Sequence, residues 1–445
     1  MKNLLVFTMF GVVALSASSA LAQANPNCLI GAYLMDNNQT LDIAPSEGST
    51  LRWTAFNGET GQLHSNQNGS WTSTLGWTGK PDGETALFSE CSRGRIAFGK
   101  RHGKRIVFDV TETNFESNGT KLVGRLVMPK GRGRVPVVVL IHGSEQESAR
   151  NGNALQRMFP AEGIGTFVYD KRGTGGSGGE YTQDVNVLAD DSVLAMKQAR
   201  HLAGSRAARI GYQGASQGGW VAPLAANRSP VDFTIVSFGL TVTVLAEDQQ
   251  SVALDMHFHH HSAEDTIKAL DLARSGERVI ETFGSEGYDE FDALRQKYRS
   301  KDWYKDVHGD FLFLVLPLDK AQIVRELTTK YNWHTSFRYD PMPTLRASNT
   351  PQLWILGSDD LKAPSAQTSA GIRSLIAQGK AFTLAVYPGV EHGMTEYELA
   401  DDGKRVSTRF APGYFQMMCD FIRNGRISNR YGDAVIKQPM DRGRR

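Results

Sequence analysis

Short runs of apolar, β-branched residues recur through the chain after Pro129 and constrain its fold more than any other feature. The first run, residues 136–141, contains one proline, three valines, a leucine and an isoleucine. A continuous apolar run of this length is typical of a β-strand that is buried on both faces. Similar runs follow at residues 165–169, 209–212, 233–236, 353–356 and 382–386. Helix-like stretches such as residues 185–203 lie between several of them, so the pattern predicts a doubly wound, mostly parallel α/β sheet.

One long interval, between Phe238 and Asn349, breaks this alternation. It has helical periodicity and many charged side chains, and Ser262 followed by Asp265 resembles a helix-capping box. A long helical insertion between two strands of a sheet is a natural position for a cap over an active site. We therefore expect a helical cap at about residues 240–348.

The segment before the sheet has a different character. From Ala24 to about Lys100 it is rich in Gly, Asn, Ser and Thr, and turn dipeptides separate its short apolar runs. This pattern predicts a small antiparallel β domain, which we place at residues 23–103, with the α/β domain at residues 104–445. Three tryptophans here could stack on sugars, but small β domains also need large aromatic side chains as core: Trp53, Trp71 and Trp77.

The first residues have the layout of an export signal. Lys2 supplies a positive charge, residues 4–15 are largely apolar, and residues 20–22 read Ala-Leu-Ala. This layout is typical of a secretory signal peptide, and the apolar run is too short to span a membrane. We predict a signal peptide at residues 1–22, cleavage after Ala22, and a periplasmic or secreted protein without a membrane anchor.

Export would place the three cysteines in an oxidising compartment, where one disulfide can form and one cysteine remains. Cys419 lies among apolar residues at helical spacing, which is typical of a buried small hydrophobic residue. Cys28 and Cys91 both lie in the N-terminal polar region. We therefore favour a disulfide between Cys28 and Cys91.

Charge and histidine spacing bear on possible partners. The chain has 49 basic and 47 acidic side chains, so its net charge indicates no nucleic acid or other polyanionic partner. A cluster near the start of the predicted cap contains His257, His259, His260 and His261. His257 and His261 have a spacing that can bind a metal on one helix, but no carboxylate follows at a useful spacing. We expect no metal site and no cofactor.

A candidate nucleophile follows the run at residues 209–212. Residues 214–218 read Gly-Ala-Ser-Gln-Gly, with a helix-like segment behind them. In a strand–turn–helix elbow the serine adopts a strained backbone conformation that exposes its hydroxyl, and the flanking glycines leave room for the tight turn. The pattern predicts Ser216 as a nucleophile.

Two further reactive side chains follow later strands. Asp360 comes after the run at residues 353–356, where a carboxylate can hold an imidazole ring in the correct tautomer. Its neighbour Asp359 competes for this role, and position alone does not separate the two. His392 comes after the last run, so the chain order is Ser216, Asp360, His392, as expected for a catalytic triad on such a sheet.

An oxyanion hole is expected beside the nucleophile. Residues 141–144, Ile-His-Gly-Ser, end the first buried strand. The backbone N–H groups of Ser144 and Gln217 would point at the developing oxyanion and stabilise it. His142 is expected to brace this loop.

These motifs together resemble the α/β-hydrolase superfamily, and more narrowly its secreted bacterial serine esterases with a cap. Residues 170–179 match the family's D-x-R-G-x-G-x-S-x-G loop, and the resemblance covers about residues 104–423. In such families the acid commonly sits as G-x-x-D-x-x-x-P, which selects Asp360 over Asp359. One departure is that relatives often continue His-Gly-Ser with Gly-Pro, whereas this chain has Glu-Gln-Glu at residues 145–147.

The resemblance implies a serine hydrolase that cleaves a small-molecule carboxylic ester through an acyl-enzyme intermediate. One alternative is a serine peptidase similar to prolyl oligopeptidase, although the N-terminal region is too short for the propeller of those enzymes. Another is a non-catalytic binding protein on a hydrolase scaffold, since fold does not imply function. The sequence leaves the natural ester and the oligomeric state open.

Overall fold

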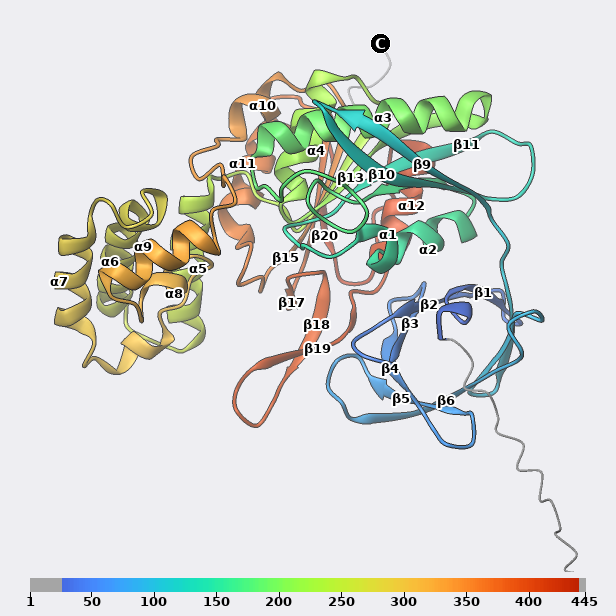
Figure 1. Ribbon diagram of the computed structural model, residues 1–445, viewed down its shortest axis with the longest axis horizontal. Helices are drawn as coiled ribbons and strands as arrows, with labels where there is room; N and C mark the ends of the chain where they lie inside the picture. The colour runs from blue at the N-terminus through green and yellow to red at the C-terminus, as the bar shows by residue number, and fades with distance from the viewer. Residues whose placement is uncertain (1–25, 440–445) are drawn as a thin grey trace, which may run out of the picture.

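A computed structural model of the protein describes residues 26–439 (Figure 1). A β-barrel comes first, a mixed sheet with helices on both faces follows, and a group of helices is inserted between two strands of that sheet. The predicted signal peptide lies outside the described residues. None of the helices within residues 26–439 is long and apolar enough to cross a membrane.

Strands β1 to β8 form a closed antiparallel barrel, because β8 pairs back onto β1. Their bounds are β1 (Gly31–Met35), β2 (Thr40–Pro45), β3 (Leu51–Ala55), β4 (Thr60–Ser65), β5 (Trp71–Leu75), β6 (Pro81–Phe88), β7 (Arg95–Phe98) and β8 (Arg101–Arg105). The last strand extends just past residue 103, and the division into domains there stays a prediction. A short 3-10 helix, η1 (Pro26–Cys28), precedes the barrel.

The cysteines and the barrel tryptophans can be compared with the sequence predictions. A disulfide joins Cys28 to Cys91, as predicted, and Cys419 is free and buried. Trp53 and Trp71 are buried in the barrel core. Trp77 remains 42% exposed and lies under the guanidinium of Arg52, whose Cζ is 3.9 Å from the ring centroid. Two of the three tryptophans are therefore core residues.

The large sheet has the strand order β20-β16-β15-β14-β13-β11-β12-β10-β9. Its bounds are β9 (Asp109–Ser117), β10 (Thr120–Met128), β11 (Val135–Ile141), β12 (Gly165–Tyr169), β13 (Ala207–Ala215), β14 (Phe233–Ser237), β15 (Gln352–Gly357), β16 (Phe382–Tyr387) and β20 (Val435–Lys437). The strands from β11 to β16 pair in parallel, and the edges are antiparallel. Each predicted apolar run is a strand here, which confirms the predicted sheet.

Helices cover both faces of this sheet, and the first buried strand shows why its residues are continuously apolar. Val137 and Val139 belong to the core under α3 (Val185–Ala203) and α4 (Gly218–Arg228). Val138 and Leu140 point the other way, to the core under α2 (Leu155–Ala161) and α12 (Tyr414–Asn424). Alternate side chains of a strand face opposite sides of the sheet, so both sets must be apolar. The remaining flanking helices are α1 (Ala149–Gly152), η2 (Gly204–Arg206) and α11 (Ser365–Ala377).

A helical cap lies between β14 and β15, and in Figure 1 its helices α5 to α9 stand apart from the sheet, whereas α10 lies beside α4. Its elements are α5 (Val244–Phe258), α6 (Ala263–Glu281), α7 (Tyr288–Tyr298), η3 (Asp302–Asp306), α8 (Leu312–Val315), α9 (Lys320–Thr329) and α10 (Met342–Ala347). Val252, Leu272, Phe291 and Leu312 belong to a buried apolar cluster within this insertion. The fold class predicted from the sequence is confirmed, including the cap and the small N-terminal β domain.

The barrel is attached to the sheet domain through a hairpin that follows the last parallel strand. The elements after β16 are β17 (Val390–Glu391), β18 (Thr395–Leu399) and β19 (Arg405–Phe410). The N–H of Phe410 donates to the carbonyl of Gly58 in the barrel at 2.8 Å, and the N–H of Trp77 donates to the carbonyl of Ser407 at 2.9 Å. A Cβ on Gly58 would lie 2.5 Å from the carbonyl oxygen of Phe410, so this close approach requires glycine. Figure 1 shows the hairpin beside the barrel strands.

Candidate active site

The nucleophile candidate Ser216 sits on a tight turn between β13 and α4. Its backbone φ is +51°, a left-handed conformation that a serine rarely adopts. A Cβ on Gly214 would lie 2.1 Å from the carbonyl oxygen of Gly218, and one on Gly218 would lie 2.5 Å from that of Ile141. The turn therefore requires glycine at both positions, and the predicted elbow geometry is present.

The structure brings His392 together with Asp360. The imidazole Nδ1 lies 2.9 Å from Oδ2 and 3.1 Å from Oδ1 of the carboxylate. The backbone N–H groups of Lys362 and Ala363 donate to Oδ1 at 3.0 and 2.7 Å, which fixes the carboxylate in place. Asp359 points elsewhere, since its carboxylate accepts from the hydroxyl of Tyr397 at 2.9 Å. The tertiary structure thus separates two neighbours that sequence position does not.

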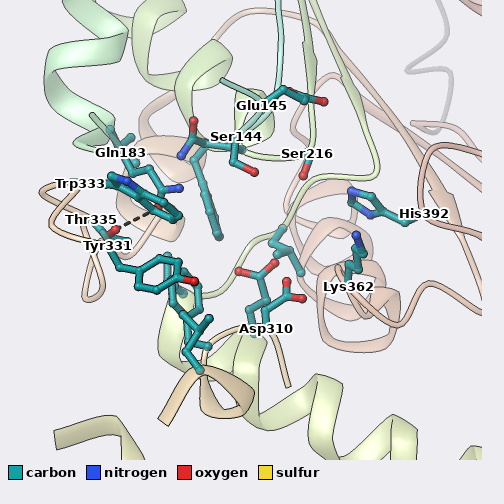
Figure 2. Close-up of a pocket in the computed structure, with 18 of the residues that line it drawn as sticks. Ser144, Glu145, Gln183, Ser216, Asp310, Tyr331, Trp333, Thr335, Lys362 and His392 are labelled. Carbon is teal, nitrogen blue, oxygen red and sulfur yellow. Dashed lines mark hydrogen bonds between the residues drawn. The ribbon is translucent and has the colours of Figure 1, made fainter. Parts of the chain in front are cut away.

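His392 and Ser216 line the same cavity, and among the described residues no hydrogen bond joins the imidazole to the Ser216 hydroxyl. Figure 2 shows the imidazole turned toward Ser216 at one end of a cavity. Burial opposes the charged ring, but the charge and hydrogen bond of Asp360 outweigh it, so the pKa of His392 is raised above its usual 6.5. Phe238 packs edge-on against the imidazole, with ring centroids 4.8 Å apart. The ring is therefore held by a carboxylate on one side and an aromatic face on another.

The cavity beside Ser216 has a volume of about 480 Å³ and walls from both the sheet domain and the cap. Both predicted oxyanion-hole residues, Ser144 and Gln217, line it together with Ser216 and His392. Residues of the cap and its connections supply the opposite wall: Glu247, Asp310, Phe311, Phe313, Leu314, Tyr331, Trp333 and Thr335. Four of the five predicted site residues thus line one cavity, and Asp360 lies behind His392.

The loop that carries Ser144 packs closely on the nucleophile. A Cβ on Gly143 would lie 3.1 Å from the Cβ of Ser216, so the small residue allows the loop to approach. His142 is buried, its Nδ1 lies 3.6 Å from Glu145, and burial lowers its pKa. Burial opposes ionisation of Glu145, but its interaction with the His142 side chain and the charge of Lys171 hold its pKa at about 2. Glu145, the departure from the family pattern, is therefore a charged residue at the cavity.

Two cap carboxyls in the cavity were not found by sequence reasoning. Burial and the neighbouring Asp248 raise the pKa of Asp310 to about 6. Burial, followed by the charge of Asp310, raises the pKa of Glu247 well above its usual range. Among the described residues, neither side-chain carboxyl has a hydrogen-bonding partner. These residues reach the site only through the packing of the cap over the sheet. No motif surrounds them in the sequence, so no sequence signal could have found them.

The histidine cluster of the cap lies away from this arrangement. Helix α5 ends at Phe258, so His257 and His261 do not share a helix face, and the spacing argument for them is wrong. His261 instead pairs with Asp306, its Nε2 lying 2.7 Å from the carboxylate. Within residues 26–439 no group of three or more His, Cys, Asp or Glu side chains could hold a metal ion.

Comparison with known proteins gives one family match, at residues 134–251, to the model described as Hydrolase_4, serine aminopeptidase, S33. This region contains Ser216 and the loop of the predicted oxyanion hole. A search of curated proteins gave no significant match.

Three similar solved structures illustrate the range of likeness. An acylaminoacyl peptidase from Pyrococcus horikoshii is 14% identical with a TM-score of 0.38, covering 79% of this chain and 52% of the peptidase. An esterase from Pyrobaculum calidifontis is 16% identical with a TM-score of 0.42, covering 72% of this chain and 86% of the esterase. Est1E from Butyrivibrio proteoclasticus, solved with ferulic acid, is 16% identical with a TM-score of 0.38, and the match covers 70% of this chain and 97% of Est1E. The chain thus spans about half the length of the acylaminoacyl peptidase.

Proposed function

We propose that this chain, which belongs to the α/β-hydrolase superfamily, is a serine hydrolase that cleaves carboxylic esters of small molecules. One observation carries the proposal. His392 is held by Asp360 at 2.9 Å and turned toward Ser216, which stands on a strained elbow at the wall of a cavity between the sheet domain and the cap (Figure 2). A hydroxyl, an imidazole and a carboxylate in this order can generate a nucleophile at neutral pH.

The proposed reaction proceeds in two halves. The Oγ of Ser216 attacks the acyl carbon while the Nε2 of His392 takes the hydroxyl proton, and Asp360 stabilises the imidazolium. The N–H groups of Ser144 and Gln217 hold the oxyanion of the tetrahedral intermediate. The intermediate collapses, the C–O bond to the alcohol breaks, and His392 returns the proton to the departing oxygen. Water, activated by His392, then hydrolyses the acyl-enzyme and restores the Ser216 hydroxyl.

A second candidate is hydrolysis of an amide next to a free amino group. Two features favour it, namely the family model's description and the two cap carboxyls Glu247 and Asp310 in the cavity. The charge of an entering ammonium group would favour the ionised forms of these two carboxyls, which would then accept its hydrogen bonds. The propeller-bearing peptidases are a less suitable comparison, because strands β1 to β8 of this chain close into a small barrel.

The test compares hydrolysis of p-nitrophenyl esters and aminoacyl p-nitroanilides by the purified protein, residues 23–445. Ser216→Ala is expected to lower ester hydrolysis by at least about 10⁴-fold, because the nucleophile is lost. Ser144→Ala is the matched control, since it keeps the backbone N–H and should retain most activity. Faster turnover of the anilides would favour the aminopeptidase-like candidate. A folded protein that is inert on both classes would support a binding function instead.

We also propose that the mature protein is periplasmic or secreted, with residues 1–22 removed. The disulfide between Cys28 and Cys91 supports an oxidising compartment. Amino-terminal sequencing of the protein recovered from cell fractions tests this proposal. A start at Gln23 in the periplasm or medium is expected, and an intact Met1 in the cytosol would contradict it.

A further inference from the structure

A buried lysine lies directly behind the predicted oxyanion hole. Lys171 follows β12 in the loop at residues 170–179, and it is 2% exposed. Its Nζ donates to the carbonyl oxygen of Gly143 at 2.5 Å and to the side-chain Oε1 of Gln217 at 3.4 Å. These contacts connect one ammonium group to the two segments whose backbone N–H groups would form the oxyanion hole.

The first contact fixes the direction of a backbone donor. The carbonyl of Gly143 and the N–H of Ser144 belong to the same peptide unit, and no described peptide bond is cis. In a planar trans peptide these two groups point in opposite directions. A group that holds the carbonyl oxygen on one side therefore also directs the N–H to the other side. A charged donor on the carbonyl also polarises the unit and makes its N–H a stronger donor.

The second contact reaches the other half of the oxyanion hole. Gln217 precedes α4, and its side chain is almost fully buried. Through Oε1 of Gln217, Lys171 contacts the same residue whose N–H would hold the oxyanion. The ammonium thus connects two loops that the sequence separates by more than seventy residues.

The next peptide unit of the loop is held by a tyrosine that the cap supports. The hydroxyl of Tyr181 donates to the carbonyl oxygen of Ser144 at 2.6 Å, and its ring centroid lies 5.0 Å from the Nζ of Lys171. Gln183 donates to the Tyr181 hydroxyl at 3.2 Å and accepts from the Thr335 hydroxyl at 2.8 Å. Figure 2 shows this last bond between Gln183 and Thr335. Both peptide units that flank Ser144 are therefore held in place.

Burying the Lys171 ammonium costs desolvation free energy, and the need to fill this volume does not explain why a charged side chain is used. Desolvation lowers the pKa of Lys171 to about 8, and Glu145 and Glu147 compensate for this only in part. The other titratable groups facing it are His142 and Tyr181. An apolar side chain of similar length would fill this volume without the desolvation cost.

From these contacts we infer that Lys171 is a positioning residue, which orients and polarises the oxyanion-hole amides of Ser144 and Gln217. The inference rests on the proposed function. It predicts that loss of the ammonium weakens binding of the transition state far more than binding of the ground state.

The experiment compares Lys171→Met and Lys171→Gln with the wild type on p-nitrophenyl acetate. Lys171→Met is expected to lower kcat by about 10- to 100-fold, less than the loss of an entire oxyanion donor, with KM changed by less than about threefold. Its affinity for a trifluoromethyl ketone, which forms an anionic tetrahedral adduct with the nucleophile, should fall by a similar factor. Lys171→Gln keeps N–H donors without the charge and should recover part of kcat. The exposed Lys197, replaced by methionine, is the matched control.

The pH profile provides a readout that simple loss of packing would not change. Lys171 carries its charge below its pKa, so wild-type kcat should decline as pH rises through about 8. Lys171→Gln should lack this decline. If Lys171→Met does not fold, the Lys171→Gln variant and the wild-type profile still decide the question. Unchanged kcat and inhibitor affinity in folded variants would overturn the inference, whereas an inactive wild type, or an active Ser216→Ala, would overturn the proposed function itself.

Discussion

Asp360 lies behind the imidazole of His392 with its Oδ2 2.9 Å from Nδ1, while the adjacent Asp359 faces Tyr397 instead. The two carboxylates are neighbours in the chain, but only one can hold the ring. Backbone N–H groups that donate to Asp360 make this arrangement rigid. The pair therefore offers a matched test of the proposed triad.

Asp360→Asn is expected to lower kcat by about 10³- to 10⁴-fold, because an amide favours the wrong imidazole tautomer and does not stabilise the imidazolium. Asp359→Asn should keep most of the activity, because its carboxylate contacts Tyr397 and Ser358 rather than His392. Steady-state kinetics on a p-nitrophenyl ester measure both. Equal losses in the two variants would contradict the assignment of Asp360.

The pH dependence of kcat/KM should follow the ionisation of His392, which must be neutral to act as a base. Asp310 raises the pKa of this ring, and Lys362 lowers it. Asp310→Asn should therefore move the acid limb of the profile to lower pH, and Lys362→Met should move it to higher pH. Profiles of kcat/KM measured for both variants check this pair of shifts. If the acid limbs of the two variants moved in the same direction, the charges of Asp310 and Lys362 would not act on His392 as described.

Reduction of the disulfide should destabilise the barrel. Cys28 and Cys91 are 63 residues apart, and cross-linking a loop of this length lowers the entropy of the unfolded chain by an amount worth about 4 kcal/mol. Urea unfolding with and without reductant measures the difference, and a Cys28→Ser/Cys91→Ser double variant should not respond to reductant. In the oxidised protein Cys419 should react with a thiol reagent only after unfolding, because it is buried.

A buried ion pair joins the barrel to the sheet domain. Arg157 of α2 donates to Asp42 of β2 through Nε at 2.6 Å and through Nη2 at 2.8 Å, and Asp42 is fully buried. Arg157→Met should destabilise the protein by about 3–5 kcal/mol, because it leaves an unpaired buried carboxylate. Adding Asp42→Asn should restore part of the loss. Urea unfolding of the single and double variants measures the coupling, and no restoration would mean that the pair does not act as a unit.

Local patterns in the sequence predicted most of the framework. Strands such as β11 were predictable because a strand buried on both faces must be continuously apolar. Helix α3 has the bounds of the predicted stretch at residues 185–203. The elbow at Ser216 was predictable because a Cβ on Gly214 would clash with the backbone of Gly218, four residues later. In each case the physical constraint acts between near neighbours in the chain.

Other features depend on contacts between residues far apart in the sequence. The sequence indicated a cap but not that its Asp310 and Glu247 would enter the cavity, nor that the helix carrying His257 would end at Phe258. Lys171 read only as a variable position of a family loop, whereas the fold places its ammonium behind two separate loops.

The sequence by itself therefore determined the parallel strands of the sheet, helix α3 and the identity of the nucleophile candidate, because periodicity and tight-turn sterics are local. The family pattern already favoured Asp360 over Asp359, and the tertiary structure showed how that carboxylate holds His392. Only the tertiary structure decided which cap residues face the cavity and where the barrel attaches. Those outcomes depend on side-chain packing and on charges that the fold brings together, so they cannot be predicted from residue spacing along the chain.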